Sequence, residues 1–273
     1  MATAMLRKLL LLVLAASVAC ASHARVHAAG VDGGGLVEFT DPGSATRLAR
    51  AQRKVDFFRL ANHFEGQTNK AFCGPTTAVI VLNALRAGDD RIEKPEDPSL
   101  VPAEVRSGLP TTFDPLYHRY TQNDLFDAKA NAVKTRGEIL GRPHALGAKP
   151  DPGLQLRQLH ALLLAKGLDA RLRIADATLS DDTIRTELKT NLATADDYVI
   201  VNYSRAALGQ EGGGHISPLG AYDEESDSFL ILDVNPNGHR WVWAPASALI
   251  RAMRTLDTVE NRGYLLVREG MQR

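Results

Sequence analysis

Short apolar segments separated by turn-forming residues fill the second half of the chain, from Tyr198 onward. They are rich in β-branched and aromatic residues, and Gly, Asn, Asp and Ser gather between them. Parallel strands need a crossover of a dozen or more residues, usually a helix, and no such helix separates most of these segments. The sequence therefore predicts a mostly antiparallel sheet with strands at 198–203, 215–222, 229–234, 241–243 and 264–267.

The first half of the chain has helical spacing instead. A segment that begins at Cys73 and ends before Gly88 is apolar on nearly every face, which predicts a buried helix with Pro75 in its first turn. The two halves together predict an α+β fold, in which a helical lobe packs on a mostly antiparallel β-sheet lobe. Other expected features are helical spacing in 45–64, a helix cap at 121–124, a helix over 154–164, a short strand at 170–174 and a helix after Ser180.

Composition is that of a globular protein. The chain has 273 residues, 44% hydrophobic and 23% charged, with 32 basic and 32 acidic residues. Disorder, collagen and coiled coil are excluded, and a zero net charge argues against nucleic acid as a partner. Two cysteines are too few for a disulfide scaffold.

The N-terminus has the pattern of a secretory signal. Arg7 and Lys8 precede an apolar run over 9–19, and small residues follow, with cleavage after either Ala24 or Ala28. We expect a signal peptide over 1–28, a flexible leader over 29–47 and a catalytic domain over 48–273. The protein would be exported, periplasmic or secreted, with no stable membrane span after signal removal. Lipoprotein anchoring through Cys20 is less favoured, because no bulky aliphatic residue precedes it at the usual position.

Simple cleavage of the signal leaves Cys73 as the single cysteine of the mature chain. A thiol at the start of a buried helix meets the positive end of the helix dipole, which favours the thiolate. The alternative is a buried cysteine that acts as a small hydrophobe. A nucleophilic cysteine needs a histidine, and His215 is the candidate because it follows three glycines and opens a strand. The other histidines of the mature chain lie in polar, loop or helix-surface contexts.

An orienting acid for His215 is predicted from the hairpin that follows it. If Tyr222 faces Phe229, the strand after the turn brings the 233–235 stretch diagonally near His215. Asp233 ends an apolar run, where an unpaired acid would be costly to bury. The alternative is that Asp233 only begins the turn into Asn235.

Several segments of the chain form a series of motifs in a fixed order. They are 67–85, Thr121-Gln122-Asn123-Asp124-Leu125-Phe126, Val199-Ile200-Val201-Asn202-Tyr203-Ser204-Arg205, 209–219 and Phe229-Leu230-Ile231-Leu232-Asp233-Val234. Together they resemble the phytochelatin synthases, papain-like enzymes that act on glutathione. The resemblance implies a papain-like fold, with Cys73 as nucleophile, His215 as acid and base, Asp233 as its orienting acid and Gln67 as a donor to the oxyanion.

The resemblance also implies glutathione as donor and as a potential acceptor of the acyl group. Because glutathione has two carboxylates and one ammonium, its site should combine arginine with acid. The expected substrate contacts are Arg205, Arg262, Asn202, Gly214 and Asp257. The spacing from Asp257 to Arg262 is shorter than the family pattern leads us to expect.

The chain resembles the short bacterial form of the family, which lacks the Cys-rich C-terminal region of the plant enzymes. We therefore expect cleavage of glutathione to γ-glutamylcysteine and glycine to dominate over transfer that gives phytochelatin. No protein-bound cofactor or metal site is expected, and Cd²⁺ or Zn²⁺ would act as a glutathione thiolate complex. A papain-like peptidase or amidase on other peptides, a non-catalytic glutathione-binding module and a homodimer are left open.

Overall fold

The computed structural model describes residues 35–238 and 240–271, so the expected signal peptide lies outside the described residues. Seven strands form one sheet in the order β1-β6-β5-β4-β3-β7-β2, and every neighbouring pair is antiparallel. The predicted α+β fold with an antiparallel sheet is confirmed. The strands are β1 Val37–Glu38, β2 Leu168–Ile174, β3 Asp197–Ser204, β4 Gly214–Asp223, β5 Ser228–Ile231, β6 Val242–Pro245 and β7 Gly263–Glu269.

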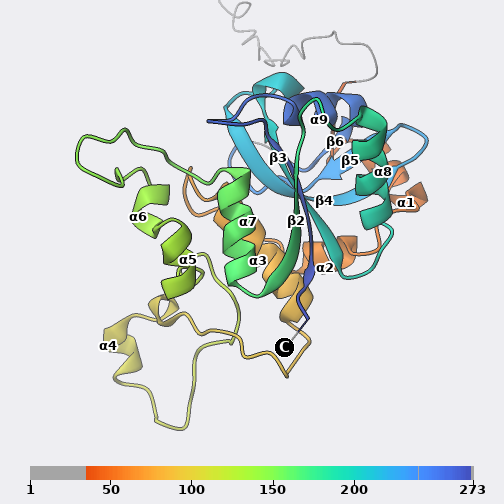
Figure 1. Cartoon of the computed structure of the whole chain (residues 1–273). Helices are drawn as coiled ribbons and strands as arrows, with labels where there is room; N and C mark the ends of the chain where they lie inside the picture. The colour runs from red at the N-terminus through yellow and green to blue at the C-terminus, as the bar shows by residue number, and fades with distance from the viewer. Residues whose placement is uncertain (1–34, 239, 272–273) are drawn as a thin grey trace, which may run out of the picture. The chain divides into compact units, whose positions relative to one another are not determined.

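Helices cover both faces of the sheet. In Figure 1, α3 and α7 lie on one side of β2, β7 and β3, and α8 lies on the other, with α4, α5 and α6 extending from the α7 side. The main helices are α1 Pro42–Arg50, α2 Phe57–Asn62, α3 Cys73–Arg86, α7 Leu156–Ala165, α8 Asp181–Asn191 and α9 Ala246–Met253. The shorter ones are α4 Ala103–Arg106, α5 Ala128–Val133 and α6 Arg136–Ile139, with 3-10 turns η1 Pro98–Leu100 and η2 Ala206–Leu208.

Helix α3 begins at Cys73, as predicted, and is buried along almost its whole length. Its first turn lies against β4, where the Thr77 hydroxyl donates to the carbonyl of Ile216 at 3.2 Å. A side chain at Gly74 would come within 3.1 Å of Leu154. The start of the helix is thus fixed on the strand that carries the candidate histidine.

Strand β4 joins the two halves of the sheet. Residues 214–218 pair with β3, and residues 219–223 pair with β5. Tyr222 faces Phe229, as the sequence predicts, but the register shifts at Gly220. A Cβ at Gly220 would lie 3.0 Å from both Leu232 and Phe57, so the close approach requires a glycine there.

Within the expected flexible leader over 29–47, the described residues form a strand and the start of a helix. Strand β1 pairs with β6, and the amide of Phe39 donates to the carbonyl of Trp241 at 2.8 Å. Ser44, in α1, is fully buried and accepts a hydrogen bond from the Trp243 indole at 2.8 Å. The glycines before residue 36 suggested disorder, but the residues after them supply a strand edge and a capped helix, so the ordered domain begins before residue 48.

One local expectation also differs from the structure. Residues 121–124 form a turn rather than a cap, and the next helix, α5, begins at Ala128 with Asp127 as its cap. Thr121 is instead engaged with Asp97, to which its hydroxyl donates at 2.6 Å. Helical spacing in 45–64 corresponds to two helices, α1 and α2, with a break between them. Helix α9 was not predicted.

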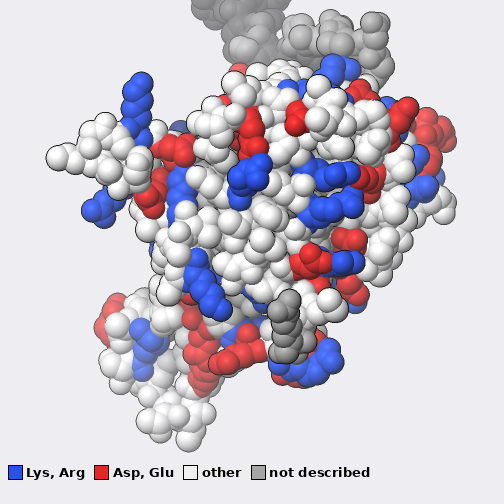
Figure 2. Space-filling view, viewed as in Figure 1, with Lys and Arg blue, Asp and Glu red and all other residues white. Residues whose placement is uncertain are grey.

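Charged side chains of both signs are interspersed on the face shown in Figure 2, without a broad area of one sign. Many charged side chains of the described residues form local ion pairs, such as that between Arg157 and Glu260 at 2.8 Å. Within the described part of the chain, no helix is both long and apolar enough to span a bilayer.

Candidate active site

Cys73 is half-buried and opens into a pocket of about 390 Å³ between the start of α3 and the sheet. Five of the sequence-predicted residues line this pocket with it. They are His215, Asn202, Gly214, Asp257 and Arg262. Residues that lie up to 189 positions apart in the chain, from Cys73 to Arg262, are therefore brought to one cavity.

Cys73 and His215 line the same pocket, where each acts on the protonation of the other. Burial alone would raise the pKa of the Cys73 thiol, but the hydrogen bond and charge of His215 and the backbone N–H groups of Ile216 and Gly74 outweigh it and lower the pKa. Burial would lower the pKa of His215, yet its hydrogen bonds to Asp233 and Cys73 raise it. The pair therefore favours thiolate and imidazolium.

Asp233 lies behind the imidazole, fully buried, with its Oδ1 at 3.0 Å from His215 Nε2. The contact is short, although the N–H direction is not aligned for a linear hydrogen bond. Asp233 also accepts hydrogen bonds from the Tyr203 hydroxyl at 3.2 Å and from the backbone N–H of Asn235 at 2.8 Å. Burial raises the pKa of Asp233, but His215 and Arg205 outweigh this effect and hold the pKa far below its usual range.

Arg205, predicted to contact substrate, is not brought to the pocket. Its guanidinium is buried against Asp233, with Nη1 and Nη2 at 2.6 and 2.9 Å from the two carboxylate oxygens. Its amide donates to the carbonyl of Gly213 at 2.9 Å, which ties down the glycine loop before His215. The structure therefore places Arg205 as the ion-pair partner of Asp233.

Arg262, Asp257 and Asn202 form a polar cluster in the pocket wall. Arg262 Nη1 lies 2.8 Å from Asp257 and donates to Asn202 Oδ1 at 3.1 Å. The Asn202 amide in turn donates to Asp257 at 3.0 Å. The guanidinium lies directly over Gly214, where a Cβ would come within 2.4 Å of Arg262 Nη1. The short spacing from 257 to 262 therefore does not separate these two residues.

Gln67 lies in the segment before α3, close to the residues that follow β5. Its amide N–H donates to the carbonyl of Val234 at 2.8 Å, and its side-chain Nε2 donates to the carbonyl of Asn69 at 2.8 Å. Its Oε1 is buried without a hydrogen-bond partner. Gln67 is not among the residues that line the pocket, so its role as an oxyanion donor stays a prediction.

Two functional candidates were missed by the sequence analysis. Lys70 lines the pocket three residues before Cys73, and the described residues offer it no ion pair. Tyr203 faces His215 across the β3–β4 ladder, and its hydroxyl donates a hydrogen bond to Asp233. Pairing the strand at 198–203 with the strand at 215–222 would have indicated Tyr203. The sequence analysis considered only the pairing of the strand at 215–222 with the strand that follows it.

One group of side chains in the described residues has the spacing of metal ligands. Glu96, Asp114 and His118 bring their ligand atoms within 4.8 Å of one another, and all three are exposed. His118 Nε2 lies 3.0 Å from a carboxylate oxygen of Glu96. This group lies outside the Cys73 pocket and was not foreseen from the sequence.

An α+β fold with a thiol at the start of a buried helix, and an imidazole on the strand that faces it, defines the papain-like class. Within that class, the chain belongs to the phytochelatin synthase family, whose family model matches residues 33–97 and 110–264.

The chain is also similar to curated proteins named glutathione gamma-glutamylcysteinyltransferase. The chain is 28% identical over 215 residues to glutathione gamma-glutamylcysteinyltransferase 3 of Lotus japonicus, covering 77% of this chain and 37% of the relative. It is 29% identical over 213 residues to glutathione gamma-glutamylcysteinyltransferase 1 of Triticum aestivum, covering 77% and 35%. With the Schizosaccharomyces pombe glutathione gamma-glutamylcysteinyltransferase, identity is 23% over 223 residues, covering 81% and 45%. The chain thus spans less than half of each relative's length.

Proposed function

We propose that this protein cleaves the Cys–Gly peptide bond of glutathione through a thiol acyl-enzyme. The observation that carries the proposal is the Cys73–His215 pair at a pocket whose wall contains both Arg262 and Asp257. The names of the curated relatives, which specify transfer of a γ-glutamylcysteinyl group, support the same chemistry.

In the proposed mechanism the Cys73 thiolate attacks the carbonyl carbon of the Cys–Gly bond. The N–H groups of the first turn of α3, with Gln67 as the proposed side-chain donor, stabilise the charge that develops on the carbonyl oxygen. His215 then donates its proton to the departing glycine nitrogen, and the C–N bond breaks to leave a γ-Glu-Cys thioester on Cys73. Asp233 holds the imidazole and stabilises its charged form.

The thioester is resolved by a second nucleophile. Neutral His215 removes a proton from water or from the amine of a second glutathione, which attacks the thioester and restores the thiolate. Water gives γ-glutamylcysteine, and the amine gives a longer γ-Glu-Cys peptide, a phytochelatin. We propose hydrolysis as the main course for this chain.

Recognition of glutathione is proposed to use the charges in the pocket. The γ-glutamyl end has one ammonium and one carboxylate, which complement Asp257 and Arg262. The glycine carboxylate would meet Lys70, which lies on the same pocket near Cys73. Cd²⁺ or Zn²⁺ would enter as thiolate complexes of glutathione, and the protein is proposed to act after export.

The direct test measures glycine release from glutathione together with the mass of the protein. The wild-type chain should release glycine and accumulate a γ-Glu-Cys adduct during turnover. Cys73→Ser should fold but release essentially no glycine, because a hydroxyl is far less acidic than a thiol. Cys20→Ser, made in the unprocessed chain that keeps residues 1–28, is the matched control and should leave the rate unchanged.

Three results would contradict this proposal. Unchanged glycine release from Cys73→Ser would remove the thiol from the mechanism. Binding of glutathione without any glycine release by the wild type would favour a binding module instead. Faster cleavage of unrelated peptides than of glutathione would favour a peptidase or amidase of the same class.

A further inference from the structure

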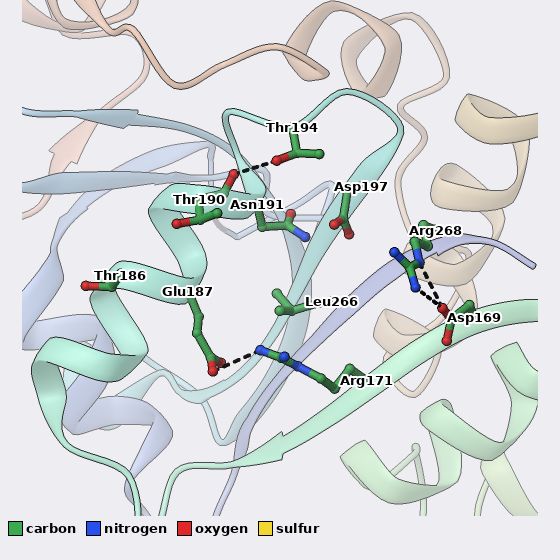
Figure 3. Close-up of a pocket in the computed structure, with 10 residues that line it drawn as sticks. All are labelled: Asp169, Arg171, Thr186, Glu187, Thr190, Asn191, Thr194, Asp197, Leu266 and Arg268. Atoms are coloured by element: carbon green, nitrogen blue, oxygen red, sulfur yellow. Dashed lines mark hydrogen bonds and ion pairs between the residues drawn. The ribbon is translucent and has the colours of Figure 1, made fainter.

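A second pocket, of about 320 Å³, lies between α8 and the strands β2, β7 and β3 (Figure 3). It is on the other face of the sheet from α3. Val199 and Val201 of β3 pack with α8 residues, whereas Tyr198 and Ile200, which alternate with them, pack in the cluster that contains α3. Asp197, on the same side as Val199, lines this second pocket, which is therefore separate from the Cys73 site.

Asn191, at the end of α8, is the buried polar group of this pocket. It is only 3% exposed, its amide nitrogen faces Asp197, and its amide oxygen has no hydrogen-bond partner. Figure 3 shows the amide next to Asp197, with no hydrogen bond marked between the two side chains. Buried polar groups are nearly always hydrogen-bonded in native proteins, because leaving them unpaired is costly. An occupant with a donor would satisfy this oxygen.

Asp197 interacts with the charges of Arg268 and Arg171 without forming a direct ion pair with either of them. Asp169 pairs with Arg268 at 2.7 Å, and Glu187 pairs with Arg171 at 2.9 Å, but within the described residues Asp197 has no ion pair. Burial raises its pKa, and the nearby Asn191 amide offsets only part of that effect. No three of the pocket's carboxylates bring oxygens within 4.8 Å of one another. The geometry therefore suits an ammonium group better than a metal ion.

Arg268, which lies beside Asp197 in Figure 3, and Arg171, which lies near Glu187, offer donors to an anion. Arg268 uses Nε and Nη2 on Asp169, and Arg171 uses Nη2 on Glu187, so Arg268 Nη1 and Arg171 Nε and Nη1 contact no carboxylate of the described residues. Leu266 lies in the centre of Figure 3, between Asn191 and Arg171. The pocket therefore combines hydrogen-bond acceptors, hydrogen-bond donors and an apolar side chain. These groups complement a molecule that has an ammonium, a carboxylate and an aliphatic part.

We propose that this pocket binds a small zwitterion, an α-amino acid or a short peptide. Its ammonium would lie on Asp197 and the Asn191 oxygen, its carboxylate on Arg171 and Arg268, and its aliphatic part over Leu266. The site is independent of the proposed glutathione cleavage, because none of its residues lines the Cys73 pocket.

The test follows the side-chain amide signals of Asn191 in the ¹⁵N-labelled full-length protein, assigned by their loss in Asn191→Ala. L-leucine is the probe, compared with N-acetyl-L-leucine, which lacks the ammonium, and L-leucinamide, which lacks the carboxylate. L-leucine should shift the Asn191 signals with saturation, and each blocked analogue should bind at least tenfold more weakly. Equal binding of all three probes, or no shift with L-leucine, would overturn the proposal.

Asp197→Asn is the matching variant, since it keeps the shape and removes the charge. It should bind L-leucine at least tenfold more weakly while its melting temperature is retained or raised, because a desolvated and unpaired charge has been removed. The control is Asp196→Asn, the same change at the neighbouring exposed residue, whose carboxylate pairs with Arg59 outside the pocket. Undiminished binding by Asp197→Asn, or equal losses in both variants, would contradict the assignment.

Discussion

At the scale of single residues, Asp233 has a proposed catalytic role and a structural role. Substituting Asp233 alone affects both roles, and a second substitution at Asp223 separates them. Asp233 orients His215 and also accepts both Nη atoms of Arg205 while buried. Asp233→Asn should lower kcat by roughly 10³ to 10⁴-fold, because an amide cannot stabilise the imidazolium. It should also lower the free energy of unfolding by about 3 kcal/mol, because Arg205 is left buried without its partner. Steady-state kinetics and urea denaturation measure the two effects.

Asp223 provides the control for that variant. It is equally buried and accepts both donors of Arg50, at 2.8 and 2.6 Å, but at the far end of β4. Asp223→Asn should also be destabilised, while kcat stays close to that of the wild type. Similar kcat losses in both variants would mean that the effect at Asp233 is only structural.

The acidity of Cys73 is the second prediction at this scale. His215 lowers the pKa of the thiol against the opposing effect of burial. In His215→Ala the burial remains and the hydrogen bond is lost, so the thiol pKa should rise. The pH dependence of Cys73 alkylation by iodoacetamide, measured in a Cys20→Ser background, should therefore move its midpoint to higher pH. An unchanged midpoint would show that His215 does not stabilise the thiolate.

The same pair determines the sign of the pH–rate profile. Cleavage requires the Cys73 thiolate, which is present above its lowered pKa, and the His215 imidazolium, which is present below its raised pKa. The rate should therefore fall on the acid side as the thiolate is protonated and on the alkaline side as the imidazolium is lost.

At the scale of elements, the first residue of β4 controls the position of Arg262. A methyl group at Gly214 would overlap Arg262 Nη1, and the guanidinium would have to move out of its place in the pocket. Gly214→Ala should raise KM for glutathione about tenfold or more, since charge-assisted hydrogen bonds contribute about 1.5–3 kcal/mol. Gly213→Ala is the control, because nothing lies within 4 Å of its Cβ position. An unchanged KM in Gly214→Ala would mean that Arg262 does not bind the substrate.

The N-terminal elements are expected to stabilise the domain that the sequence analysis began at residue 48. A chain that starts at residue 48 loses β1, which pairs with β6, and most of α1, including Ser44. The buried Trp243 indole then loses its acceptor. We expect this chain to unfold at a lower temperature than one that starts at residue 35, with a loss of at least about 2 kcal/mol. Equal melting temperatures would restore the leader interpretation.

At the scale of the whole molecule, patterns of alternation and helical spacing predicted the strands and helices. They did not predict the irregularities where these elements meet. The sheet, the buried helix at Cys73 and the pairing of Tyr222 with Phe229 follow from side-chain periodicity, which is local. The bulge at Gly220 was not predicted, because its cause is the approach of Leu232 and Phe57 from distant segments.

The candidate site was predictable to a similar extent. Residue types with a chemical motif, such as Cys73 and His215, were found from the sequence and lie together in the structure. Arg205 was assigned to the substrate because its charge suits a carboxylate, yet the nearest carboxylate in the fold is Asp233. Only the three-dimensional structure decides which of several acids an arginine meets.

The last prediction concerns the balance between hydrolysis and transfer. The acyl-enzyme meets water at about 55 M, so transfer needs a second glutathione held with a high effective concentration beside Cys73. The pocket at Cys73, of about 390 Å³, has one Arg262–Asp257 pair to receive a γ-glutamyl end. At micromolar glutathione the products should therefore be γ-glutamylcysteine and glycine in equal amounts. At millimolar glutathione a minor longer peptide should appear, because transfer is second order in glutathione and hydrolysis is not.

Metal should affect this balance through the substrate. Cd²⁺ prefers thiolate ligands, and glutathione supplies them. Chelation by EDTA should leave hydrolysis unchanged, and any gain in longer peptide on adding Cd²⁺ should persist in His118→Ala, which removes a ligand of the exposed Glu96, Asp114 and His118 group. Mass spectrometry of the products measures each arm. Longer peptides that dominate at micromolar glutathione would instead require a tight acceptor site, and loss of the Cd²⁺ effect in His118→Ala would place the metal on the protein.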